Sequence, residues 1–155
     1  MGQTITVGDK APDFTLKDQD QNDVTLSSFQ SKKNVVLAFY PLDFSPVCSK
    51  EHSCFRDDLK EFEKLNAQVL GLSVDSVWAH KAFAEHLKVS YPLLADFHPR
   101  GEAAAKFGLY LDDKGITNRA TVVIDKGGVV RHVHVNEILE QRDNKSIEKV
   151  LEGLS

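Results

Sequence analysis

Apolar runs separated by polar segments predict strands that alternate with helices along this chain. Residues 35–40 form an apolar, β-prone run, and residues 68–73 predict a second buried strand. Between them, apolar residues recur at helical spacing over about 46–66, and a further amphipathic helix is predicted over 77–86. This alternation favours an α/β fold with a mixed sheet that is covered by helices on both faces.

Shorter elements are predicted on either side of this central pattern. Apolar residues in 11–16 and 24–26 flank the polar segment 19–23, which predicts an N-terminal β-hairpin. The other predicted elements are a short strand at 91–95, a helical turn at 102–107, a hairpin made of 121–124 and 129–135, and a helix at 146–154.

Composition limits the classes of function that this chain can serve. With 155 residues, of which 41% are hydrophobic, we expect a single domain over 1–155. The net charge of -4, with acidic and basic residues interspersed, predicts no nucleic-acid partner. No apolar stretch approaches the roughly 18 residues that span a bilayer, and no signal-peptide pattern opens the chain. We therefore expect a cytoplasmic protein without a membrane partner.

Cys48 falls where the strand, turn and helix pattern places the start of a helix. Ser45 fits the N-cap position, and Pro46 fits the first helical turn. Unpaired backbone N–H groups and the positive end of the helix dipole would then favour a nucleophilic thiolate. The alternative is a buried, inert cysteine that serves as an apolar core residue.

The spacing of the cysteines and histidines predicts neither a metal site nor a cofactor. The chain has two cysteines, Cys48 and Cys54, and their spacing does not fit the usual zinc-binding pairs. A structural disulfide is also disfavoured, because such bridges normally close longer loops. His132 and His134 would share one face of a strand, but the sequence indicates no third ligand for a metal.

The motif around Cys48 resembles that of the peroxiredoxins, which are thiol peroxidases. The family pattern P-x-x-x-T/S-x-x-C is met by Pro41, Ser45 and Cys48. Further matching landmarks are A-P-D-F-T-L at 11–16, G-L-S-V-D-S at 71–76 and N-R-A-T-V-V-I-D at 118–125. The chain looks most like the alkyl hydroperoxide reductase E group, and next most like the bacterioferritin-comigratory, or Q-type, group.

This resemblance implies a thioredoxin-like fold and a thiol-dependent peroxidase activity. Hydrogen peroxide and organic hydroperoxides would be reduced to water and alcohols through a sulfenic acid on a peroxidatic cysteine. The resemblance also implies thioredoxin or a glutaredoxin-like protein as reductant, and a homodimer.

Individual roles follow from the same resemblance. Cys48 would be the nucleophile, and Arg119 would stabilise both the thiolate and the leaving oxygen. Ser45 would hydrogen-bond the peroxide, Pro41 would shield the sulfur, and Glu51 would orient Arg119. Judged from the residues alone, an arginine at the end of a strand is more often solvated or paired with a carboxylate.

Cys54 is the candidate resolving cysteine, although helix geometry opposes direct contact with Cys48. Six residues give a rise of about 9 Å and place the two side chains about 120° apart around the helix. A disulfide needs Cα atoms within roughly 7 Å, so the first helical turns would have to unwind. Otherwise Cys54 is a buried helix residue that packs with Phe55 and Leu59. We expect His52, on the same helix, to lie on its exposed surface.

Two other functions use the same cysteines. A thiol-disulfide oxidoreductase is one, although that chemistry prefers the shorter C-x-x-C spacing. The other is a redox sensor or holdase, which would register oxidation of Cys48 without catalysis.

Overall fold

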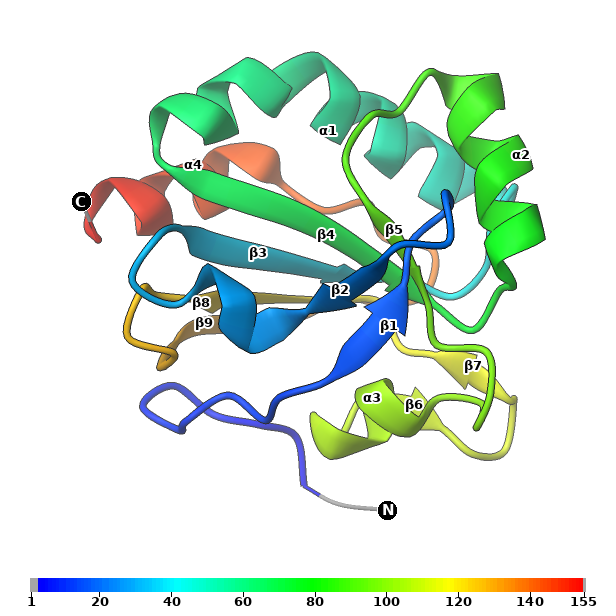
Figure 1. Ribbon diagram of the computed structural model, residues 1–155, viewed down its shortest axis with the longest axis horizontal. Helices are drawn as coiled ribbons and strands as arrows, with labels where there is room; N and C mark the ends of the chain where they lie inside the picture. The colour runs from blue at the N-terminus through cyan, green and yellow to red at the C-terminus, as the bar shows by residue number, and fades with distance from the viewer. Residues whose placement is uncertain (1–2, 155) are drawn as a thin grey trace.

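The computed structural model describes residues 3–154, and a seven-stranded mixed sheet forms its centre (Figure 1). The neighbouring pairs β3·β4 and β4·β5 are parallel, whereas the other four neighbouring pairs are antiparallel. In spatial order the strands are β2 (Asp23–Thr25), β1 (Thr15–Lys17), β5 (Leu93–Ala95), β4 (Ala67–Ser73), β3 (Asn34–Phe39), β8 (Ala120–Ile124) and β9 (Val130–Val135).

Helices cover both faces of this sheet, as the sequence predicts (Figure 1). One face carries α1 (Pro46–Lys64), α2 (Val77–Leu87) and α4 (Asn144–Glu152). The other face carries the short α3 (Glu102–Lys106), the N-terminal arm and a 3-10 helix at Leu26–Phe29. Two hydrophobic cores result, one on each side of the sheet.

The unbroken apolar run of β3 is explained by these two cores. All six residues of β3 are buried, because the strand lies inside the sheet and is covered on both faces. Side chains alternate between the faces of a strand, so Val35, Leu37 and Phe39 enter one core. Val36 and Ala38 enter the other core, under α1. Burying an aliphatic or aromatic side chain of this size contributes about 1.5–3 kcal/mol.

The predicted elements are confirmed, with shifts of a few residues at their ends. The N-terminal hairpin exists but is shorter than predicted, because only three residues of each strand pair. A small hairpin of β6 (Tyr110–Leu111) and β7 (Ile116–Thr117) was not predicted. Strands of two residues are too short to produce a recognisable alternation of apolar and polar positions.

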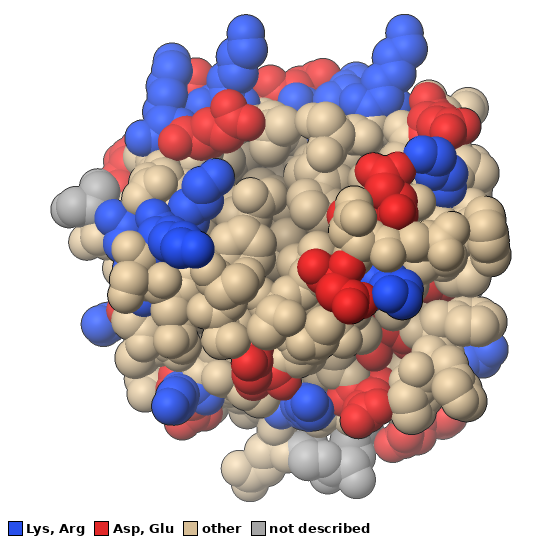
Figure 2. Space-filling view, viewed as in Figure 1, with Lys and Arg blue, Asp and Glu red and all other residues tan. Residues whose placement is uncertain are grey.

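Over residues 3–154, no helix combines the length and the apolar character that crossing a bilayer requires. On the face shown in Figure 2, basic and acidic side chains are interspersed along the rim.

The register of the sheet brings two distant segments together. Phe39, the last residue of β3, pairs with Ala120, the first residue of β8. The loop that leads from β3 to α1 therefore begins beside the residue that precedes β8, which is Arg119.

Candidate active site

Cys48 is the third residue of α1, and its side chain is fully buried. Ser45 is the N-cap residue with extended backbone angles, and Pro46 opens the helix as predicted. The side chain of Ser45 does not cap the helix, however, and its hydroxyl instead donates to the Leu42 carbonyl at 3.1 Å. The first N–H groups of a helix have no intrahelical acceptor. Those at the start of α1 are therefore available to a ligand beside the sulfur.

Arg119 contacts the thiol directly and is not a solvated surface residue. Its Nη2 donates to Cys48 Sγ at 3.1 Å, and only 1% of the residue is exposed. Its Nη1 pairs with Glu51, one turn after Cys48 on α1, and its Nε donates to the Ile138 carbonyl at 2.7 Å. Three separate partners thus fix the guanidinium, and a buried positive charge faces the sulfur.

A second buried arginine, Arg142, was missed by the sequence analysis. Its backbone N–H donates to Glu51 Oε2 at 2.8 Å, and its Nε lies 3.3 Å from the same oxygen. The guanidinium also donates to the carbonyls of Phe39 and Ala120 and to Thr121 Oγ1. Burial lowers the pKa of Arg142, and the charge of Glu51 opposes this shift. Arg142 lies in an irregular segment outside any motif, so no local pattern indicates its role.

The loop between β3 and α1 is fastened to the protein interior through Asp43. Its carboxylate accepts hydrogen bonds from Tyr40 Oη at 2.6 Å and from His80 Nδ1 at 2.7 Å. The other ring nitrogen of His80 lies 3.0 Å from the Leu94 carbonyl, so both nitrogens face acceptors. The backbone N–H of Asp43 donates to Asp75 Oδ2 at 2.8 Å. Burial and the charge of Asp43 raise the pKa of Asp75.

Phe44 completes this loop in an unusual conformation. Its φ of 67° lies in the left-handed region, which costs a bulky residue of the order of 1–3 kcal/mol. The hydrogen bonds of the preceding residue, Asp43, hold the loop in this shape immediately before Ser45. Pro41 is buried at the beginning of the same loop.

The expectation that His52 is exposed is wrong. The residue is fully buried, and its Nδ1 lies 2.5 Å from Tyr91 Oη. Burial, together with the nearby Arg142, lowers the pKa of His52 well below its usual value, so the ring is neutral. The glycine at position 71 of β4 makes this packing feasible, because an added Cβ there would lie 3.1 Å from His52 Cε1. This close approach of α1 to the sheet could have been suspected from Gly71 inside an apolar strand.

Cys54 lies on the same continuous helix as Cys48 but in a different environment. Both thiols are free; Cys48 is buried, whereas Cys54 is partly exposed. The Cys54 sulfur accepts a hydrogen bond from Gln141 Nε2 at 3.2 Å, and it borders a shallow surface pocket with Ser49 and Ser53.

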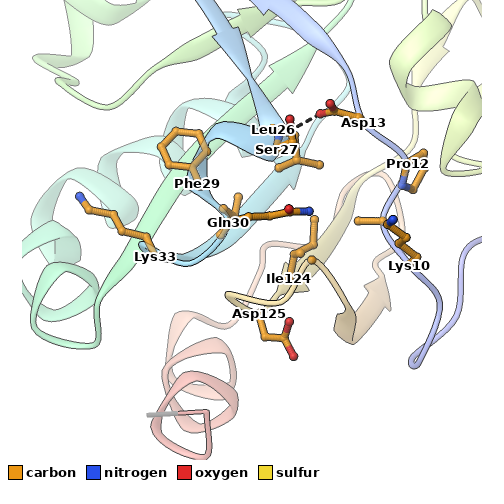
Figure 3. A pocket seen from close by; sticks show the side chains of 13 residues that line it. Lys10, Pro12, Asp13, Leu26, Ser27, Phe29, Gln30, Lys33, Ile124 and Asp125 are labelled. Atoms are coloured by element: carbon orange, nitrogen blue, oxygen red, sulfur yellow. Dashed lines mark hydrogen bonds between the residues drawn. The ribbon is translucent and has the colours of Figure 1, made fainter.

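A pocket of about 490 Å³ lies away from this site (Figure 3). It is lined by Val35 and Ile124, which pair with each other at the opposite end of β3 and β8 from Phe39 and Ala120. None of the predicted site residues lines it, so it is not the peroxide site.

The arrangement at Cys48 can support nucleophilic chemistry at an electrophilic oxygen. The Cys48 sulfur lies at a helix start and is contacted by a fixed guanidinium, which is the kind of setting in which cysteines act as nucleophiles. The same guanidinium and the free N–H groups can stabilise negative charge on a leaving oxygen. Together with the mixed sheet, this site defines the class of thiol-dependent peroxidases.

Comparison with known proteins agrees, and the chain belongs to the AhpC/TSA family, whose model matches residues 7–133. It is 40% identical over 141 residues to alkyl hydroperoxide reductase E of Mycobacterium tuberculosis, covering 91% of this chain and 92% of the relative. It is 39% identical over 151 residues to the chloroplastic peroxiredoxin Q of Sedum lineare, covering 97% and 80%.

A solved structure confirms the thioredoxin-like fold. Peroxidoxin BcpB from Mycobacterium tuberculosis superposes with a TM-score of 0.85 at 34% identity, and the match covers 96% of this chain and 97% of that one. The protein is therefore a peroxiredoxin that reduces peroxides with a thiol.

Proposed function

We propose that Cys48 is the peroxidatic cysteine and that it reduces hydrogen peroxide and organic hydroperoxides. The single observation that carries this assignment is the 3.1 Å hydrogen bond from Arg119 Nη2 to Cys48 Sγ inside the protein. The contact holds a positive charge beside the sulfur, where it can stabilise the negative charge that the reaction involves.

The proposed reaction is an in-line displacement at the peroxide. The thiolate attacks one oxygen, an S–O bond forms, and the O–O bond breaks with both electrons leaving on the second oxygen. Cys48 is oxidised to a sulfenic acid that keeps the proton of the attacked hydroxyl. The leaving alkoxide or hydroxide takes a proton from solvent and departs as alcohol or water. Negative charge thus moves from sulfur to oxygen, and Arg119 lies where it can stabilise both.

Ser45 is proposed to accept a hydrogen bond from the peroxide. Its hydroxyl proton is already donated to the Leu42 carbonyl, which leaves lone pairs on Oγ free to accept from a peroxide O–H. The backbone N–H groups of Val47 and Cys48 are proposed donors from the helix start.

Glu51 and Pro41 are proposed to act through other groups. Glu51 holds Arg119 by an ion pair, so we assign it the orientation of the guanidinium toward the sulfur. Buried Pro41 fixes the loop and shields the sulfur from water and further oxidation.

The sulfenic acid is proposed to be reduced by a second thiol. Cys54 serves as the resolving cysteine after the start of α1 unwinds, and thioredoxin or a glutaredoxin-like protein reduces the resulting disulfide. We also propose that the protein works in the cytoplasm as a homodimer, which associates through loops near the active site.

Stopped-flow measurement of peroxide consumption by the reduced protein tests this function. We expect a rate constant far above that of a free thiol, its complete loss in Cys48→Ser, and retention of the first oxidation step in Cys54→Ser. A rate equal to that of a free thiol would instead support a redox sensor. Rapid reduction of a model disulfide without peroxidase activity would support a thiol-disulfide oxidoreductase.

A further inference from the structure

Two histidines lie side by side on the edge strand β9. His132 and His134 are two positions apart, so their side chains leave the same face of the strand. Their rings are stacked, with centroids 6.5 Å apart and an interplanar angle of 19°. His132 is partly buried, whereas His134 is exposed.

Tertiary structure adds oxygen donors that the sequence did not indicate. A pocket of about 300 Å³ is bordered by β9, the segment 136–143 and the start of α4. Glu140, Asn136 and Asp143 line this pocket together with both histidines. Glu140 is exposed, and one of its carboxylate oxygens accepts only a weak hydrogen bond from the Glu137 N–H at 3.2 Å.

Asn136 provides an independent sign that the pocket suits a polar ligand. The residue is 6% exposed, and its Oδ1 is buried without a hydrogen-bond partner among the described residues. A buried carbonyl oxygen without a partner is destabilising, and a ligand or its bound water would supply the missing hydrogen bond.

Arg142 also lines the pocket, but its guanidinium is held by groups other than the two histidines and Glu140. It donates to Thr121 Oγ1 and to two backbone carbonyls, and it pairs with Glu51, which it shares with Arg119. Asp143 is occupied as well, because its carboxylate caps α4 through the Lys145 N–H and the Ser146 hydroxyl.

We propose that His132, His134 and Glu140 bind one divalent transition-metal ion of the Zn²⁺ type. Two imidazoles and a carboxylate are ligands that suit Zn²⁺, and three protein ligands leave a fourth position for water. That water can donate to the unpartnered Oδ1 of Asn136. Binding requires rotation of the side chains of His134 and Glu140, which both lie at the surface.

A second cluster of side chains that can bind metals is a weaker candidate for the Zn²⁺ site. Asp43, Asp75 and His80 bring donor atoms within 4.8 Å of one another. Both ring nitrogens of His80 are already engaged, one by Asp43 Oδ2 at 2.7 Å and the other by the Leu94 carbonyl at 3.0 Å, so a metal ion there would have to displace an existing hydrogen bond.

Calorimetric titration of Zn²⁺ into the untagged Cys48→Ser, Cys54→Ser protein tests the proposal, because removal of both thiols excludes binding to sulfur. We expect one saturable site. In this background His132→Ala and His134→Ala should each weaken binding by at least about tenfold, and Glu140→Gln should weaken it less. His86→Ala, at an exposed histidine on α2, is the matched control and should bind Zn²⁺ like the parent.

Thermal unfolding supplies a second readout. A ligand that binds only the folded state raises the midpoint of unfolding, so Zn²⁺ should raise it in the parent and not in His134→Ala. Absence of saturable binding, unchanged binding in His134→Ala, or loss of binding in Asp75→Asn would each overturn the proposal. The test is independent of peroxidase activity.

Discussion

Arg119 Nη2 lies 3.1 Å from Cys48 Sγ, although 71 positions separate the two residues in the chain. The antiparallel register of β3 with β8 creates this contact, because it pairs Phe39 with Ala120. Both side chains are buried, so water does not screen the guanidinium from the sulfur. The charge of Arg119 therefore interacts with the sulfur more strongly than it would at the protein surface.

Replacing Arg119 by alanine should slow oxidation of Cys48 by peroxide by about 10²–10³-fold, the usual effect of removing one preorganised donor to a developing anion. Stopped-flow kinetics measures this rate. Arg131→Ala is the control, because Arg131 is exposed on β9 and pairs with Asp125. Equal rates for Arg119→Ala and the unmodified protein would show that the guanidinium does not assist the reaction.

Glu51→Gln should lower both the free energy of unfolding and the peroxidase rate. The glutamate pairs with two buried arginines, so its neutralisation leaves buried positive charge uncompensated. Loss of one partner of a buried ion pair costs about 3–5 kcal/mol, which urea unfolding can measure.

The matched control on the same helix is Glu61→Gln. Glu61 pairs with Lys64 at the surface, where such pairs contribute about 1 kcal/mol or less. A Glu51→Gln protein as stable and as active as Glu61→Gln would refute the proposed role of the ion pair.

His52 should make the protein less stable in acid. Its pKa in the folded state lies well below the usual value of 6.5, so below pH 6.5 the unfolded state binds a proton that the folded state excludes. The free energy of unfolding should therefore fall by up to about 1.4 kcal/mol per pH unit as the pH drops below 6.5.

Urea unfolding at about pH 7.5 and about pH 5.5 measures this slope. The slope should be smaller in His52→Gln, which removes the titrating ring and keeps a hydrogen-bonding group for Tyr91. His86→Gln, at an exposed position, should retain the full slope. Identical slopes in His52→Gln and the unmodified protein would contradict the prediction.

One equivalent of peroxide should convert the reduced protein to an internal disulfide between Cys48 and Cys54. Mass spectrometry of the intact protein and its peptides distinguishes this product from a sulfenic acid or an intermolecular adduct. Gln141→Ala should speed the second step, because it frees the Cys54 sulfur from its hydrogen bond. Detection of the sulfenic acid or an adduct alone would make Cys54 a structural residue.

Much of the fold could be predicted, because the signals for it are local. The apolar run of β3 and the helical spacing in α1 reflect burial on both faces of a strand and on one side of a helix. The hairpin of β6 and β7 escaped prediction because such short strands carry no periodic signal.

The sequence by itself indicated the proposed nucleophile, since Cys48 follows a strand and lies in the first turn of a helix within a recognisable motif. It also indicated Arg119 and Glu51, but only through the resemblance of that motif to a family. Tertiary structure alone decided that Arg142 joins them, that His52 is buried, and that Glu140 lines the same pocket as His132 and His134. These relationships depend on strand register and on the path of residues 136–143 across the sheet. Strand register and the path of this segment leave no local pattern of polar and apolar positions, because each contact joins residues that are distant along the chain.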